Sequence, residues 1–140
     1  MRKKKFGIVG CGHIGKRHAA VLDHLTDTEL VNLCDDVPNR AKALSELYGE
    51  IDHFENYADF LNQEFDVVSI CTPHHLHKPM AMQALKAGKH VVVEKPMALY
   101  SADAKEMSAT ALDLGLKLYV VKQNRFNVPV RLAEEAIKDG

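Results

Sequence analysis

Three glycines, Gly10, Gly12 and Gly15, interrupt the first apolar run of this chain and restrict what its start can form. Their spacing, G-x-G-x-x-G, is typical of a strand that turns sharply into a helix. Gly10 permits the turn, and Gly15 lets the helix pack close to the strand. Gly12 lets the backbone approach a pyrophosphate, which the N–H groups at the helix start then face. Any glycine-rich turn between a strand and a helix can match this pattern, so a second feature has to support it.

That second feature is an acidic pair, Asp35 and Asp36, which ends the next apolar run. Dinucleotide-binding folds place an acidic residue about twenty positions beyond the glycines, where it binds the adenosine ribose. A carboxylate there also repels the 2′-phosphate of NADP, so the pair favours NAD. Alternatively, the two residues open the loop before Pro38 and cap the following helix. Both interpretations hold together if Asp35 serves the ribose and Asp36 or Asn39 serves the turn.

Short apolar runs alternate with segments of helical periodicity along the whole chain. The strands we expect are residues 5–9, 30–34, 51–54, 66–71, 90–94 and 116–121, and the helices are 16–25, 39–48, 56–61, 76–87, 101–114 and 130–138. This alternation predicts an α/β fold with an open, doubly wound parallel sheet of the Rossmann type. Right-handed crossovers and the glycine turn give the strand order 3-2-1-4-5-6.

Two finer expectations concern helices. In the first helix, periodicity turns one apolar face inward, formed by Ile14, His18, Val21, Leu22 and Leu25. Ser101 is expected to cap the helix 101–114, and Asn56 the helix 56–61.

Polar side chains follow the ends of the predicted strands, and they are Asp35, Thr72, His74, His75, His77, Glu94, Lys95, Gln123 and Arg125. Ligands of such sheets bind beyond the carboxyl ends of the strands, so these residues predict one site at that edge. His74, His75 and His77 have a spacing that zinc could use, but no Cys or carboxylate cluster stands near them, and we expect no metal. Lys95 could also be a plain surface lysine with Glu94 as its exposed partner.

Composition restricts the partners and the setting. The chain of 140 residues is long enough for one domain with a core, and its formal net charge of −1 gives no reason to expect nucleic acid or an anionic membrane. No apolar run has the length of a membrane span or the form of a signal peptide, so we expect a soluble, cytoplasmic protein. Cys11, Cys34 and Cys71 lie at or beside strand ends, which favours small buried residues over a redox or metal site.

Several motifs together carry a family resemblance, and they are the glycine spacing, Thr72-Pro73-His74-His75-Leu76-His77, Ala87-Gly88-Lys89-His90-Val91 and Glu94-Lys95-Pro96. With them the chain resembles, over essentially its whole length, the glucose-fructose oxidoreductase, inositol dehydrogenase and rhizopine catabolism (Gfo/Idh/MocA) family. Members are NAD(P)-dependent oxidoreductases that act mostly on sugars, cyclitols and related small molecules. Gln123-Asn124-Arg125-Phe126 is most similar to the branch that oxidises nucleotide-linked sugars.

The resemblance implies a role for each matching residue. The cofactor would be held by Gly10, Gly12, His13, Ile14 and Gly15 at the pyrophosphate, Asp35 at the adenosine ribose, Thr72, Pro73 and His77 along its middle, Glu94 at the nicotinamide-side ribose and Gln123 at the carboxamide. Lys95 would exchange a proton with the substrate hydroxyl, as general acid/base chemistry requires, and Arg125 would approach the substrate. The Lys95–Pro96 bond is often cis in this family. His74 departs from the family, which often has Asn there.

The resemblance also implies a division of the chain. Residues 1–124 would form the dinucleotide-binding domain, and residues 125–140 would begin the connection to a second α/β domain that binds the substrate. Such parents usually form homo-oligomers through the second domain, whereas these 140 residues alone could be a monomer without turnover. Two other functions use the same glycines, namely a non-catalytic dinucleotide sensor, which does not need Lys95, and an adenine-nucleotide or S-adenosylmethionine binder, which leaves Glu94-Lys95-Pro96 unexplained.

Overall fold

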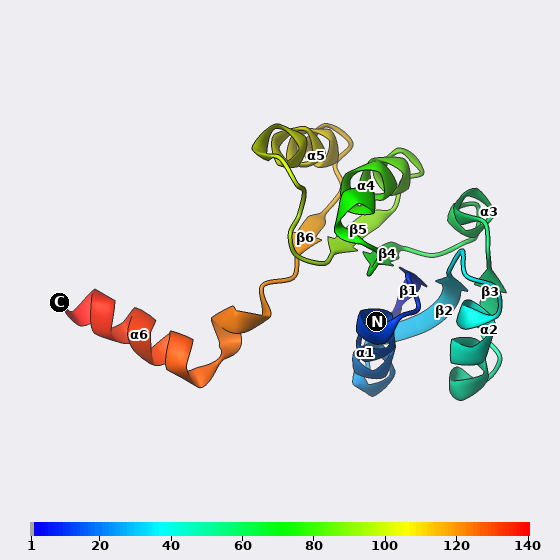
Figure 1. The fold of residues 1–140 in the computed structure, drawn as a ribbon, viewed down its shortest axis with the longest axis horizontal. Helices are drawn as coiled ribbons and strands as arrows, with labels where there is room; N and C mark the ends of the chain where they lie inside the picture. Colours follow the sequence, from blue (N-terminus) through cyan, green and yellow to red (C-terminus); the bar gives the residue numbers. More distant parts are fainter. Residues whose placement is uncertain (1) are drawn as a thin grey trace.

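A six-stranded parallel sheet organises the protein, whose computed structural model describes residues 2–140 (Figure 1). The strands are β1 (Lys4–Val9), β2 (Thr28–Cys34), β3 (Asp52–Phe54), β4 (Val67–Ile70), β5 (His90–Val93) and β6 (Leu118–Val120). Their order is β3-β2-β1-β4-β5-β6, and every neighbouring pair is parallel. The predicted fold class and strand order are therefore confirmed.

Helices cover both faces of the sheet. They are α1 (His13–His24), α2 (Arg40–Ser45), α3 (Tyr57–Leu61), α4 (His77–Lys86), α5 (Ser101–Asp113) and α6 (Val128–Asp139), with short 3-10 turns η1 (Glu46–Tyr48), η2 (His74–Leu76) and η3 (Gln123–Phe126). In Figure 1, α1 and α2 lie on one side of the sheet, and α4 and α5 lie on the other. The figure also shows η3 and α6 leading away from the sheet, and no residue of α6 is buried.

The core consists of two apolar clusters, one on each face. Ile8 and Leu33 pack with residues of α1 and α2. Val68 and Val91 pack with residues of α3, α4 and α5, including the fully buried Phe60. Because both faces are covered, the central strands are continuous apolar runs rather than alternating ones. Each large side chain buried in this way stabilises the fold by about 1.5–3 kcal/mol.

Helix α1 turns a narrower face to the sheet than periodicity predicts. Gly15, Ala19 and Leu22 are its buried residues, whereas Val21 is 59% exposed and Leu25 is 46% exposed, so the inward positions predicted for Val21 and Leu25 are wrong. The reason is the close approach at Gly15. It brings the small residues of the helix against the sheet and rotates the larger ones toward its flanks.

The two predicted caps have different outcomes. The side chain of Asn56 accepts hydrogen bonds from the N–H groups of Ala58 and Asp59, as a cap should. Ser101 is instead the first residue of α5, whose N-cap position is held by Tyr100 without a side-chain hydrogen bond. The cap predicted at Ser101 is therefore wrong. Within residues 2–140, no helix is both long enough and apolar enough to cross a membrane.

Candidate functional site

The glycine turn joins β1 to α1, and each of its three glycines meets different surroundings. Gly10 has a φ of +90°, and a Cβ there would lie 2.7 Å from the backbone of Cys71. A Cβ on Gly15 would overlap the carbonyl oxygen of Gly10. The turn predicted at Gly10 and the close packing predicted at Gly15 are thus confirmed. A Cβ on Gly12, by contrast, would meet no protein atom within 4 Å, so the fold itself does not require a glycine there.

A cavity of about 680 Å³ lies at this turn, at the carboxyl ends of β1, β2 and β4. We call it the glycine-loop cavity; its lining includes Gly10, Gly12, His13, Ile14, Asp35, Asp36, Arg40, Thr72, Pro73 and His74. Its position is the switch point at which the strand order reverses, where doubly wound sheets bind their ligands. Its volume is in the range of small-molecule and cofactor sites.

A second cavity of about 340 Å³ adjoins the first. We call it the Lys95 cavity; its lining includes Glu94, Lys95, Gln123, His18 and Val21. The two cavities share Ile14, Cys71, Thr72 and His74. Arg125 joins Lys95 and Gln123 around a neighbouring hollow of about 300 Å³. The structure therefore brings the polar residues of several strand ends together in one continuous site, as the sequence predicts.

Asp35 is almost completely buried and holds the glycine turn in place. Its Oδ2 accepts a hydrogen bond from the N–H of Cys11 at 2.8 Å, and its Oδ1 accepts one from the N–H of Val37 at 2.9 Å. The guanidinium of Arg40 lies 3.4 Å from both oxygens. Asp35 itself, rather than Asp36 or Asn39, thus stabilises the turn after β2. A carboxylate has about four lone-pair sites, so little acceptor capacity is left for a ligand.

Asp36 and Arg40 complete this end of the cavity. Asp36 is exposed and lines the glycine-loop cavity beside Asp35. Sequence reasoning missed Arg40, because nothing in a residue at the start of a helix indicates that it pairs with the carboxylate five positions earlier. Asp35 pairs with Arg40, whereas Asp36 and Glu55, which also line this cavity, form no ion pair among the described residues.

His77 is fully buried and is among the residues around the Lys95 cavity. Its Nδ1 is 2.7 Å from the carbonyl oxygen of Pro96, and its Nε2 is 2.9 Å from that of Thr72. The ring therefore ties the segment after β4 to the segment after β5. Its ring is fully buried and both nitrogens are engaged by protein carbonyl oxygens, and the direct cofactor contact predicted for His77 stays a prediction. The same bonds prevent it from binding a metal with His74 or His75.

Thr72 differs from His77 because its side chain lacks a hydrogen-bond partner within residues 2–140. Its Oγ1 is buried, and no hydrogen-bond partner for it is found among the described residues. Buried polar groups nearly always have a partner, so an orphaned hydroxyl on the wall shared by both cavities indicates a place where a ligand would supply one. Together with the open space at Gly12, this fits a polar ligand that runs from one cavity into the other.

Glu94 and Lys95 end β5 in different environments. Glu94 is largely buried, and its Oε1 lies 2.8 Å from Nε2 of His18. Lys95 is exposed, and within residues 2–140 its ammonium group forms no ion pair. The Lys95–Pro96 peptide is cis, as the resemblance implies. Sequence reasoning named Glu94 and Lys95 but assigned no functional role to His18, which is 76 positions away from Glu94.

The cysteines behave as small buried residues at the same edge. Cys11 and Cys34 are buried and Cys71 is half-buried, and all three are free thiols. The pKa of each thiol is raised to about 12, mainly by burial and, for Cys11, also by the charge of Asp35. Protonated thiols are poor nucleophiles and metal ligands. The structural interpretation of the cysteines is confirmed.

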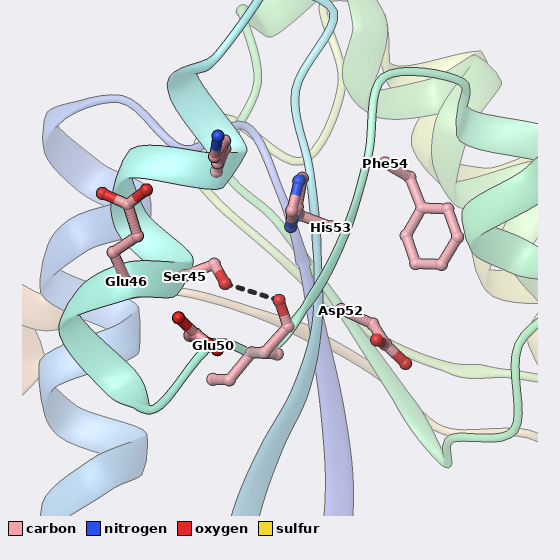
Figure 2. Close-up of a pocket in the computed structure, with 8 residues that line it drawn as sticks. Ser45, Glu46, Glu50, Asp52, His53 and Phe54 are labelled. Atoms are coloured by element: carbon pink, nitrogen blue, oxygen red, sulfur yellow. Dashed lines mark hydrogen bonds between the residues drawn. The ribbon is translucent and has the colours of Figure 1, made fainter.

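A separate cavity of about 370 Å³ lies between α2, η1 and β3, and Figure 2 shows its lining. The hydroxyl of Ser45 donates to the carbonyl of Ile51 at 2.5 Å there. The carboxylates of Glu46, Glu50 and Asp52 point in different directions. None of the predicted site residues lines this cavity, and within residues 2–140 no group of three His, Cys, Asp or Glu could hold a metal ion. We therefore assign it no role.

Comparison with known proteins gives the family. Residues 4–122 match the family described as "Oxidoreductase family, NAD-binding Rossmann fold", which is the Gfo/Idh/MocA family. The chain belongs to this family. As a member of the Gfo/Idh/MocA family, it carries the family's NAD-binding Rossmann fold.

Named relatives in the family act on sugars and cyclitols. The chain is 36% identical over 138 residues to D-glucoside 3-dehydrogenase of Escherichia coli (strain K12), covering 97% of this chain and 39% of that protein. It is 34% identical over 140 residues to inositol 2-dehydrogenase of Rhizobium meliloti (strain 1021), covering 97% of this chain and 41% of that protein. The chain thus spans about two fifths of the length of these relatives.

A solved structure in the family extends the comparison to three dimensions. The WlbA dehydrogenase from Bordetella pertussis, crystallised with NADH and UDP-GlcNAcA, superposes with a TM-score of 0.92 at 39% identity. The match covers 99% of this chain and 43% of that one. The agreement extends over the sheet and the strand ends that form both cavities.

Proposed function

We propose that this chain forms the cofactor-binding part of a dehydrogenase that transfers hydride between a hydroxyl group of a sugar, cyclitol or nucleotide-linked sugar and NAD. One observation carries the proposal: the glycine-loop cavity continues into a second cavity that presents Lys95, Gln123 and, beside it, Arg125. A non-catalytic sensor needs the first cavity alone. Cationic and amide groups at its far end instead favour a place where a polar substrate meets the cofactor.

The residues present fit NAD. Gly12 and the first N–H groups of α1 would hold the pyrophosphate, with His13 and Ile14 beside it. The adenosine ribose would bind at the acidic end, where Asp36 is exposed beside the largely engaged Asp35. Thr72 and Pro73 would line the middle of the cofactor, and the hydroxyl of Thr72 would gain the partner it lacks. Bound NAD would supply the hydride acceptor.

At the nicotinamide end, the roles belong to the residues after β5 and β6. Glu94 would accept a hydrogen bond from the nicotinamide-side ribose, and Gln123 would bind the carboxamide. Lys95 would hold the proton of the substrate hydroxyl at its Nζ, and Arg125 would bind the substrate from the adjoining hollow. A lysine amine suits this exchange because its protonation state can change during the reaction, which is what general acid/base catalysis needs.

The same charges favour NAD over NADP. Asp35 and Asp36 place two carboxylates at the ribose end, and Arg40 is engaged by Asp35 rather than free for a phosphate. A 2′-phosphate would therefore face net negative charge. Like charges brought together in a partly buried site disfavour binding.

The proposal also covers the domain division and the oligomeric state of the parent protein. Residues 1–124 would be the NAD-binding domain, and residues 125–140, including the exposed α6, would lead into a second α/β domain that completes the substrate pocket over Lys95. The parent would be a homo-oligomer through that second domain, and the 140-residue chain would be a monomer. Mass measurement of both in solution tests this assignment.

The experiment on catalysis uses the complete protein that contains this domain. We expect Lys95→Ala to lower kcat by about 10²–10⁴-fold toward a panel of glucosides, inositols and UDP-linked sugar acids, because a positioned acid/base contributes about that much. The dissociation constant of NAD should change little. Lys117→Ala, a substitution away from the site, is the matched control. Unchanged turnover in Lys95→Ala would contradict the enzymatic role and favour the sensor.

A further inference from the structure

A chain of hydrogen bonds crosses from α1 to the ends of two strands beneath the Lys95 cavity. Nδ1 of His18 lies 2.6 Å from Oγ of Ser69, and Nε2 of His18 lies 2.8 Å from Oε1 of Glu94. The other carboxylate oxygen of Glu94 accepts a hydrogen bond from the N–H of Lys95 at 3.2 Å. The side chains of His18 and Glu94 are only 18% and 14% exposed. His18 thus links Ser69 of β4 to the carboxylate of Glu94 after β5.

One direction of these bonds satisfies all of the partners. Ser69 can donate its hydroxyl hydrogen to Nδ1, and Nε2 then carries the ring hydrogen and donates it to Glu94. Ser69 in turn lies 3.9 Å from Sγ of Cys71, whose pKa is raised to about 12 and which therefore keeps its hydrogen. In this arrangement every polar hydrogen of the hydrogen-bond chain has an acceptor. This arrangement leaves Glu94 as the terminal acceptor at the cavity wall.

A hydrolytic role for these groups is excluded by burial. An acid, a histidine and a serine in this order activate serine nucleophiles in hydrolases. Ser69, however, is 1% exposed and lies within β4, so no substrate carbonyl can reach its oxygen. The chain of bonds therefore acts on Glu94 rather than through Ser69.

We propose that His18 is a positioning residue that holds the carboxylate of Glu94 in the orientation that receives the nicotinamide-side ribose. The inference rests on the proposed function, in which Glu94 binds that ribose. A free glutamate side chain loses considerable rotamer entropy when a ligand immobilises it. His18 removes this loss in advance, because it is itself held by Ser69. Since His18 belongs to the helix that begins at the glycine turn, it also fixes the distance between the two ends of the cofactor site.

The test compares two substitutions that divide the contacts of His18. In His18→Gln the amide nitrogen replaces Nε2 and keeps the donor to Glu94. In His18→Asn the amide ends near the position of Nδ1, so only the contact with Ser69 is kept. Both variants remove the imidazole and differ in which partner they retain. The isolated 140-residue chain is titrated calorimetrically, and its unfolding in urea is measured for each variant.

Three ligands that differ by one fragment each are the probes: ADP, ADP-ribose and NAD. We expect His18→Asn to weaken the binding of ADP-ribose and NAD about 10-fold or more, because a hydrogen bond to a charged group is lost. The affinity for ADP should stay the same, since ADP lacks the second ribose. His18→Gln should restore binding to within about 3-fold of the wild type. In a Glu94→Gln background, adding His18→Asn should lower the affinity for NAD only a little further, because the two residues act through the same interaction.

Each other outcome has a definite meaning. If the wild-type chain binds neither NAD nor ADP, the proposed function fails and the inference fails with it. If the wild type binds but the two His18 variants behave alike, or ADP weakens as much as NAD, His18 is merely structural and the inference alone is overturned. If His18→Asn does not fold, Ser69→Ala takes its place. That variant removes the anchor of His18 and should weaken NAD about 3-fold without affecting ADP, and equal loss of both would overturn the proposal.

Discussion

The imidazole of His77 connects two loops of the site. Its Nε2 lies 2.9 Å from the carbonyl oxygen of Thr72, and its Nδ1 lies 2.7 Å from that of Pro96. Through these bonds the turn after β4, which carries the unpartnered hydroxyl of Thr72, keeps a fixed position relative to Lys95. The sequence placed His77 at the correct edge of the sheet, but spacing alone could not show that its two nitrogens contact carbonyl oxygens of two different loops.

Substituting single glycines of the turn by alanine, which adds one methyl group, distinguishes effects on folding from effects on cofactor binding. Gly12→Ala should leave the free energy of unfolding within about 1 kcal/mol of the wild type, because its Cβ meets no protein atom within 4 Å. It should weaken NAD at least about 10-fold, because the methyl group would occupy space along the pyrophosphate. Urea denaturation and calorimetric titration measure the two effects.

Gly15→Ala is the matched control, since its Cβ would overlap the carbonyl of Gly10. It should destabilise the fold by about 1–3 kcal/mol or more. Equal destabilisation by both alanines, or full NAD affinity in Gly12→Ala, would contradict the assignment of Gly12 to the cofactor.

Among the elements, α1 shows what apolar periodicity can and cannot predict. Its existence and approximate limits follow from the glycine spacing and the apolar repeat. Its buried face, however, depends on how closely it approaches the sheet at Gly15, and this distance is a tertiary property. Val21 is therefore turned toward the wall of the Lys95 cavity instead of the core.

This correction predicts a contrast between neighbouring residues of α1. Leu22→Ala should destabilise the domain by about 2–4 kcal/mol, because Leu22 is 7% exposed and its removal leaves a cavity. Val21→Ala should change the free energy of unfolding by less than about 0.5 kcal/mol. Both values come from urea titrations of the two variants beside the wild type. Similar losses of stability in the two variants would instead favour the buried helix face that periodicity predicts.

For the whole molecule, the sequence predicts the sheet order and the common edge of the site, because the carboxyl ends of parallel strands meet at one edge. The pairs Asp35–Arg40 and His18–Glu94 are not predictable in this way. They depend on side-chain directions between segments that only the folded chain brings together. The sequence therefore identifies where the chemistry is placed, and the structure shows which residues bind and which ones hold the binding residues.

The most direct test of the account is a calorimetric titration of the 140-residue chain with NAD and with NADP, for the wild type and Asp36→Ala. Asp36 is the suitable position because it is exposed, whereas a change at Asp35 would also release the glycine turn. We predict that the wild type binds NAD at least about 10-fold more tightly than NADP, and that Asp36→Ala narrows this difference. Equal affinity for the two, or binding of neither, would contradict the assignment of this site to NAD.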